Sequence, residues 1–122
     1  MIPAAPGTLD LLDVPHALKT RGIQTMELCH FHLSPDPTYH AEFAAAVRES
    51  GVELWSLLID DGDLTNPDHG ERDAAWIAKW LDTAGDLGAR CVRVIAGKQR
   101  ATPETLAVAR ERLRALSVDG YL

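Results

Sequence analysis

The chain has 122 residues, of which 46% are hydrophobic and 25% are charged, and its formal net charge is −6. This length and composition predict one domain over residues 1–122 with an ordinary hydrophobic core. The acidic balance argues against a protein that binds nucleic acid or acidic membranes by general charge attraction, so we expect neither kind of partner.

The two cysteines, Cys29 and Cys91, form no CxxC motif. Both fall in expected strands, which favours small buried thiols in a reducing compartment over a disulfide. The sequence lacks an apolar run of about 18 residues, the length that suggests a membrane-spanning helix. Residues 1–7 also lack the basic start of a secretory signal peptide. These features predict a cytoplasmic protein.

Helical and strand-like patterns alternate along the chain, and a glycine follows each of the first three helical patterns, at Gly22, Gly51 and Gly88. Short apolar strands between helices that end at glycine predict an α/β fold of parallel βα repeats. Three strands and four helices are far too few for a closed eight-stranded barrel of about 250 residues. The expected helices are 14–21, 37–50, 71–87 and 103–116, and the expected strands are 23–31, 52–59 and 90–97, with a fourth strand near Val118.

Alternation within each strand divides the side chains between two faces of the sheet. One face is expected to pack against the helices and the other to line an interior that is apolar but also carries an acid, a hydroxyl and a base. The middle strand is apolar almost throughout, so its sequence gives the weakest indication of which side chains face the helices. The side chains expected to face the helices are Met26, Leu28, Val92 and Val94, and those expected on the other face are Glu27, Cys29, Arg93, Ile95, Leu54, Ser56, Leu58 and Asp60.

Glu27 and Arg93 have two possible roles, a structural ion pair or contacts to a substrate or its neighbouring groups. An unpaired buried charge costs several kcal/mol. We therefore expect the two side chains to be linked directly, through Ser56, or through water.

His30 and His32 have an i, i+2 spacing, which in a strand puts both imidazoles on one side. Such a pair can bind a metal ion. Two imidazoles leave a divalent site short of ligands, however, so a position in the pocket lining or on the surface is favoured and no metal site is predicted.

Asp60-Asp61-Gly62-Asp63 looks like a calcium loop, but the glycine and closing glutamate of an EF-hand are not in place. A turn that enters the next helix is the favoured interpretation. Trp76 and Trp80 are expected to pack in the core rather than to stack on a ligand.

Four stretches of the chain carry a family resemblance. They are Gly22-Ile23-Gln24-Thr25-Met26-Glu27-Leu28, Leu57-Leu58-Ile59-Asp60-Asp61-Gly62-Asp63-Leu64, Trp80-Leu81-Asp82-Thr83-Ala84 with Leu87-Gly88-Ala89, and Val92-Arg93-Val94-Ile95-Ala96-Gly97. Together they resemble the sugar phosphate isomerase/epimerase family, the xylose isomerase-like TIM barrels. The resemblance covers the whole chain and corresponds to the first half of that barrel. It implies a partial (half) TIM barrel without its C-terminal half, either a fragment, a truncated gene product or a deliberately halved barrel.

The resemblance implies an enzyme that isomerises or epimerises a sugar or polyol by proton abstraction beside a carbonyl, commonly with a divalent metal that stabilises the enediolate. In that family the metal-binding and catalytic residues come mostly from later strands. This chain is therefore expected to be inactive alone and to hold no cofactor, and its catalytic residues are unknown. The residues expected to contact substrate are Glu27, His30, His32, Ser56, Asp60 and Arg93.

Two functions remain open. The chain is either part of a barrel enzyme whose chemistry needs the other half or a second copy, or a non-enzymatic βα module that acts through oligomerisation or partner binding. A three-stranded parallel sheet has two open edges and an uncovered inner face, and both features favour association. We therefore expect a homo-oligomer or a complementary half as the partner.

Overall fold

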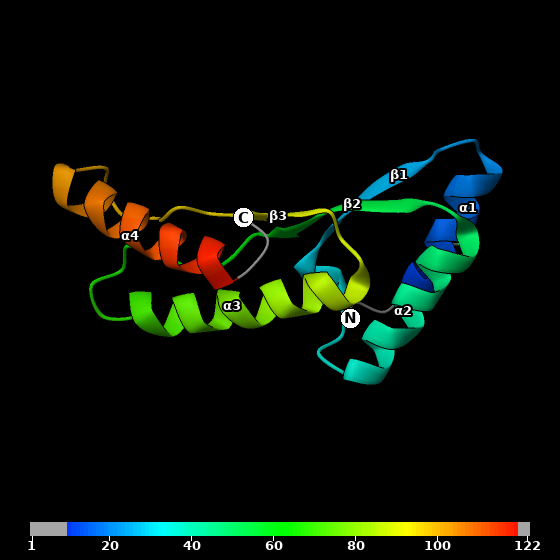
Figure 1. The fold of residues 1–122 in the computed structure, drawn as a ribbon, viewed down its shortest axis with the longest axis horizontal. Coiled ribbons are helices and arrows are strands. Elements are labelled where there is room, and N and C mark those ends of the chain that lie inside the picture. Colours follow the sequence, from blue (N-terminus) through cyan, green and yellow to red (C-terminus); the bar gives the residue numbers. More distant parts are fainter. Residues whose placement is uncertain (1–9, 120–122) are drawn as a thin grey trace.

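The computed structural model describes residues 10–119, with side chains through Ser117. Its strands alternate with its helices, as the sequence predicts (Figure 1). The strands are β1 (Thr25–Cys29), β2 (Glu53–Ile59) and β3 (Cys91–Val94). The helices are α1 (Val14–Thr20), α2 (Pro37–Ser50), α3 (Gly70–Leu87) and α4 (Pro103–Asp119), with short 3-10 turns η1 (Leu11–Asp13) and η2 (His30–His32).

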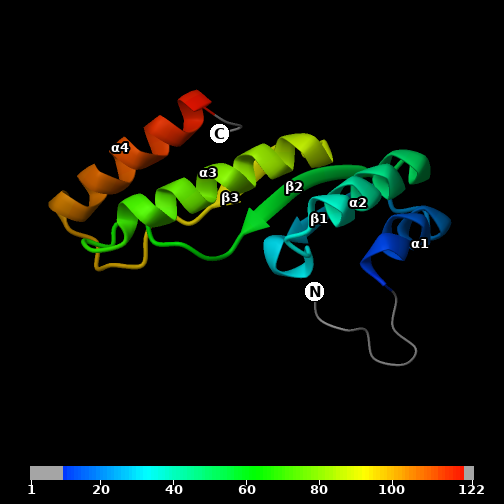
Figure 2. The same cartoon turned by 90° about the horizontal axis from the view of Figure 1, so that it is seen from below.

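The three strands form one parallel sheet in the order β1-β2-β3. Helices α2 and α3 run along one face of this sheet, with α1 beside α2 and α4 beside α3 (Figures 1 and 2). Within residues 10–119 no helix or strand packs on the opposite face, which we call the open face. Consecutive parallel βα units with the helices on one side confirm the predicted α/β class.

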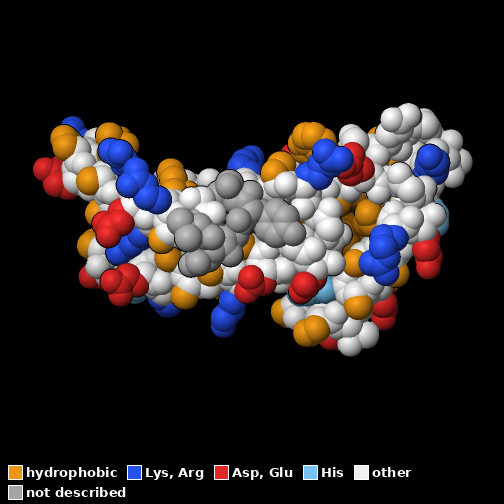
Figure 3. All heavy atoms as spheres, viewed as in Figure 1, with side chains coloured by type: hydrophobic (Ala, Val, Ile, Leu, Met, Phe, Trp, Pro, Cys, Tyr) orange, Lys and Arg blue, Asp and Glu red, His pale blue; other side chains and the backbone are white. Residues whose placement is uncertain are grey.

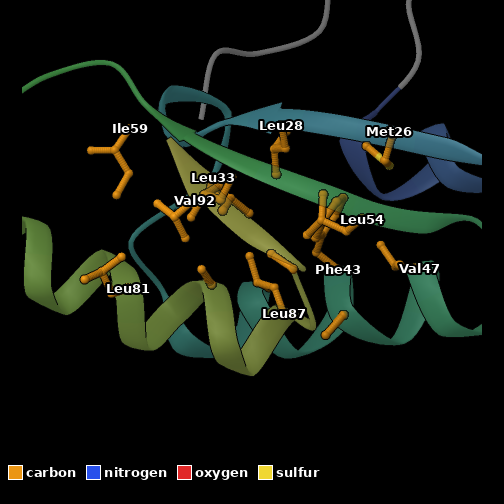
Figure 4. Packing of buried hydrophobic residues seen from close by; sticks show 14 of the residues in the cluster. Met26, Leu28, Leu33, Phe43, Val47, Leu54, Ile59, Leu81, Leu87 and Val92 are labelled. Carbon is orange, nitrogen blue, oxygen red and sulfur yellow. The ribbon is translucent and has the colours of Figure 1, made fainter. Parts of the chain in front are cut away.

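The core lies between the covered face of the sheet and helices α2 and α3 (Figure 4). Met26, Leu28 and Val92 point from the strands toward the helices, as expected from their alternation. Burying an apolar side chain of this size contributes roughly 1.5–3 kcal/mol. The largest fully buried side chains are Phe43, Leu54, Leu57, Ile59, Leu64, Ile77 and Pro15.

Local signals in the sequence fix the helix ends. At the start of α2, the Asp36 carboxylate accepts a hydrogen bond from the Thr38 amide at 2.9 Å. At the start of α4, the Thr102 hydroxyl accepts a hydrogen bond from the Thr105 amide at 3.1 Å, and the Thr105 hydroxyl accepts one from the Thr102 amide at 2.8 Å. Helix α2 stops at Gly51, whose φ of 76° lies in the left-handed region.

An irregular residue interrupts the pairing of β1 with β2. Met26 aligns with Leu54, but the next β1 residue, Glu27, aligns with Ser56, so Trp55 is an extra residue on β2. This β-bulge shifts the alternation by one position. Leu54 therefore faces the helices and is 1% exposed, and its predicted place on the other face is wrong. Ser56 and Leu58 lie on the open face, as predicted.

Two expectations about the last helix are wrong. The spacing of Leu106, Ala109, Leu113 and Leu116 predicts that Leu106 lies on the inner face of this helix. Leu106 is instead 61% exposed, because the first turns of α4 extend beyond the N-terminal end of α3 (Figures 1 and 2). The strand expected near Val118 does not begin there, since α4 continues to Asp119.

Among the helices of residues 10–119, none combines the length and apolar character needed to cross a bilayer. Both cysteines are free thiols, half-buried rather than buried as predicted. Among the described residues, basic and acidic side chains are interspersed over the face seen in Figure 3.

Candidate functional site

The candidate site lies where the three strands end. Turn η2 follows β1 directly, the 60–69 loop follows β2, and the 95–102 loop follows β3. Parallel strands bring these segments to one edge of the sheet, which is where α/β folds bind ligands. Side chains of the open face near this edge are the ones a ligand can reach.

Arg93 and Asp60 form an ion pair at this edge of the open face. The Arg93 Nη2 atom contacts Asp60 Oδ1, and the side chains are 56% and 30% exposed. The second carboxylate oxygen, Oδ2, accepts a hydrogen bond from the Cys29 thiol at 3.2 Å. Three neighbouring strand ends thus meet at one carboxylate, with a guanidinium beside it that is open to solvent.

The direct link predicted between Glu27 and Arg93 is wrong. The two residues belong to the outer strands, β1 and β3, which the middle strand separates by about 9–10 Å. Glu27 also aligns with Ser56, whereas Arg93 aligns with Leu58, two residues further along β2. Arg93 instead pairs with Asp60. Glu27 is exposed on the open face, and Ser56 is 5% exposed.

His30 lies beneath Asp60, out of the solvent. Its side chain is 5% exposed, and its ring packs edge-on to Trp76 and Trp80 with centroid distances of 5.3 Å each. The Nδ1 atom accepts a hydrogen bond from the main-chain amide of Asp60 at 3.1 Å. The main-chain carbonyl of Leu58 lies 3.4 Å from the same atom. An amide can only donate and its contact to Nδ1 is the shorter of the two, so we assign the ring proton of neutral His30 to Nε2. The two tryptophans pack in the core, as predicted.

Burial is the main reason that the pKa of His30 lies below its usual value of 6.5. The Leu58 carbonyl and the charge of Asp61 oppose this effect and do not cancel it. The ring is therefore neutral at pH 7, which is the form that the hydrogen bond to Asp60 requires.

His32 does not join His30 in a common site. The two residues belong to the 3-10 turn η2 rather than to a strand, so the i, i+2 spacing turns their side chains to different sides. His32 is exposed while His30 is buried. The expectation that both imidazoles share one side is wrong.

Within residues 10–119, no three His, Cys, Asp or Glu side chains are grouped so that they could hold a metal ion. These residues therefore do not fit the divalent metal that the family resemblance implies.

Asp63 is a buried carboxylate that joins two loops, and its role was missed in the sequence. Its Oδ1 atom accepts bonds from the Thr65 amide at 3.0 Å, the Thr65 hydroxyl at 2.8 Å and the Lys98 amide at 2.8 Å. Its Oδ2 atom accepts a bond from the Gln99 side chain at 2.8 Å. The loop after β2 is thereby tied to the loop after β3.

The hydrogen bonds to Asp63 outweigh its desolvation. Burial alone raises the pKa of a carboxyl, but the bonds from Gln99, Lys98 and Thr65 lower the pKa of Asp63 to about 2. The spacing from Asp63 to Thr65 is a turn signal in the sequence. No local pattern, however, points to partners 35 and 36 residues away.

The same two loops touch at Gly97. A Cβ atom at this position would lie 2.3 Å from Thr65 Oγ1 and 2.6 Å from Thr65 Cγ2. Only glycine allows the backbone after β3 to approach Thr65 this closely. Gly97 and Asp63 thus secure the same junction next to the candidate site.

Comparisons with known proteins agree with this fold. The family model described as "Xylose isomerase-like TIM barrel" matches residues 15–118. Among solved structures, a D-psicose 3-epimerase crystallised in the presence of D-fructose superposes with a TM-score of 0.72 at 11% sequence identity. The superposition covers 92% of this chain and 43% of that epimerase. No curated protein matches the chain in sequence.

Proposed function

Because the chain belongs to the xylose isomerase-like TIM barrel family, we propose that it supplies one side of the substrate pocket of a sugar isomerase or epimerase. The observation that carries this proposal is the Asp60–Arg93 pair, which stands at the carboxyl ends of the strands on the open face. A guanidinium offers up to five N–H donors and a carboxylate offers acceptors. Together they can bind adjacent hydroxyl groups of a sugar or polyol.

The six proposed substrate contacts have different places in this pocket. Asp60 and Arg93 would touch the ligand directly. Glu27 and Ser56 lie deeper along the open face, toward the amino ends of the strands. His30 would act through Asp60, and the exposed His32 would border the entrance.

The chemistry of the proposed reaction needs more than this chain. Proton abstraction beside a carbonyl requires a positioned base and a group that stabilises the enediolate. The described residues show no grouped metal ligands, and the resemblance assigns most catalytic residues to later strands. We propose that the chain is inactive alone and that a complementary half or a second copy completes the site. The compartment we propose is the cytoplasm.

Binding of D-fructose, followed by NMR amide shifts, tests the proposal. We expect D-fructose to perturb the amides of Asp60 and Arg93. Arg93→Met should weaken the affinity about tenfold or more, the effect of losing a charged hydrogen-bond donor. Arg90→Met is the matched control, since Arg90 is also an exposed ion-paired arginine of the β3 region but pairs with Glu53 at the other end of the sheet.

Equal affinities of the two variants, or fructose shifts confined to other regions, would contradict the proposed pocket. A direct assay with D-fructose and added Mn²⁺ should show no epimerised sugar above the blank. Turnover by the isolated chain would contradict the proposed dependence on a second half.

A second candidate function is a non-enzymatic module that acts by association. The observation in its favour is that β1 and β3 each have one unpaired edge among the described strands and that the open face is uncovered there. This function predicts a dimer or larger oligomer in sedimentation at micromolar concentration. It also predicts no shift on addition of D-fructose, which separates it from the first. A well-behaved monomer would contradict it.

A further inference from the structure

The buried His30 ring contacts the candidate site at the main chain of Asp60 rather than at the Asp60 carboxylate. The Nδ1 atom of His30 accepts a hydrogen bond from the main-chain amide of Asp60 at 3.1 Å. Asp60 is the first residue after β2, where the strand no longer fixes the backbone. The orientation of the Asp60 carboxylate on the open face therefore depends on how this peptide group is held.

We propose that His30 is a positioning residue, whose neutral ring holds the peptide of Asp60 so that the carboxylate is presented to Arg93 and to a ligand hydroxyl. The part of this inference that concerns the ligand rests on the function proposed above. The contact to the peptide stands independently, since it follows from the hydrogen bond between Asp60 N and His30 Nδ1.

Protonation of His30 reverses the role of Nδ1. The imidazolium carries an N–H on both ring nitrogens, so Nδ1–H and the Asp60 amide would be two donors facing each other. Nδ1–H can then donate to the Leu58 carbonyl, which lies 3.4 Å away, whereas the Asp60 amide loses its acceptor. Either the ring turns or the start of the 60–69 loop moves. Trp76 and Trp80 pack against the ring and oppose its rotation, so the displacement falls on the loop and on the Asp60–Arg93 pair.

Few charged groups surround this switch. From the β1 side, the Cys29 sulfur is 3.9 Å from Nδ1. From the loop after β2 come Asp60 and Asp61, and the charge of Asp61 favours protonation of the ring. Helix α3 contributes the Trp76 and Trp80 rings and, beside Asp61 and Trp76, the charged side chains of Arg72 and Asp73. The ring of His40 in α2 lies 6.2 Å from that of Trp80, centroid to centroid. Arg93 of β3 reaches the cluster through Asp60.

The wild-type chain gives the first test, by NMR over a pH series. At neutral pH the ¹⁵N shifts of His30 should show the Nε2–H tautomer. As the pH falls below about 6.5, the usual histidine pKa, the Asp60 amide proton should move upfield and exchange faster with water, with the same midpoint as the His30 ring. An Nδ1–H tautomer, or an Asp60 amide that does not follow the ring, would overturn the inference.

Two substitutions separate positioning from packing. Asparagine places its side-chain oxygen where Nδ1 lies, whereas glutamine reaches toward the position of Nε2. His30→Asn should therefore keep the Asp60 shift and lose its pH dependence, and His30→Gln should displace it at every pH. His16→Asn, in the exposed histidine of α1, is the matched control and should behave as wild type. If neither His30 variant folds, the wild-type pH series still decides.

Affinity for D-fructose gives a second readout. Between about pH 7.5 and a pH below the His30 midpoint found in the NMR series, the affinity of the wild type should fall about five- to tenfold, as for the loss of one hydrogen bond. His30→Asn should change little over this range. An affinity for D-fructose that stays the same when His30 becomes protonated would overturn the inference. If fructose does not bind while the Asp60 amide follows the ring, the proposed function fails and the positioning role stands.

Discussion

The junction at Asp63 gives the sharpest test of the energetics. Replacing Asp63 by Asn keeps the shape of the side chain and removes the charge that four hydrogen bonds stabilise. A folded-state pKa of about 2 against the usual 3.8 corresponds to about 2 kcal/mol in favour of the ionised form. We expect Asp63→Asn to lower the free energy of unfolding by about this amount at pH 7.

The assay is urea denaturation followed by tryptophan fluorescence. With a urea dependence of about 2 kcal/mol per molar for a small protein, the midpoint should fall by about 1 M. The matched control is Asp61→Asn, two residues away. The Asp61 side chain is 57% exposed, and its partner Lys98 is 49% exposed, so this change should cost less than about 1 kcal/mol.

The stability that ionised Asp63 contributes should disappear as the pH falls. A depressed carboxyl pKa gives stability that is complete above the unfolded value of 3.8 and is lost as the pH falls toward about 2. The difference between wild type and Asp63→Asn should therefore shrink to a few tenths of a kcal/mol across this window. Equal stabilities of Asp63→Asn and Asp61→Asn at pH 7 would refute the reasoning.

Three further outcomes follow from the structure. Arg93→Met should cost at most about 1 kcal/mol in urea denaturation, because its ion pair is solvent-exposed; a loss of about 3–5 kcal/mol would indicate a buried charge instead. Gly97→Ala should destabilise the chain through its clash with Thr65, and a double-mutant cycle with Thr65→Ala should recover part of the loss; simple additivity would contradict the contact. Metal analysis after dialysis should find no stoichiometric zinc or manganese, because the described residues include no group of three metal ligands. About one retained ion per chain would contradict this and would point to a site that includes His30 or His32.

The order of helices and strands could be predicted because its signals are local. Gly51 and Gly88 end α2 and α3 in the left-handed region, and Asp36 caps the start of α2 by accepting a hydrogen bond from the nearby Thr38 amide. The faces of β1 and β3 follow from simple alternation of apolar and polar side chains. Each of these signals lies within a few residues of the structure it determines.

The contacts of the candidate site could not be predicted in the same way. The pairing of Arg93 with Asp60 rather than Glu27 depends on which strand lies in the middle of the sheet and on the register. The separation of His30 from His32 depends on the chain leaving β1 as a 3-10 turn immediately after Cys29. The partners of Asp63 come from a loop that the sequence places about one βα unit later.

The extra residue at Trp55 has a consequence for aligning this chain with other barrels. Before Trp55, even-numbered β2 residues such as Leu54 face the helices, whereas after it the odd-numbered Leu57 and Ile59 do so. A relative without the bulge has one residue fewer between the same two structural positions. A gap-free alignment anchored on Leu54 would therefore assign Ser56 and Leu58 to the covered face and Leu57 to the open one. Alignments across this strand need a one-residue gap at Trp55 before functional positions are transferred.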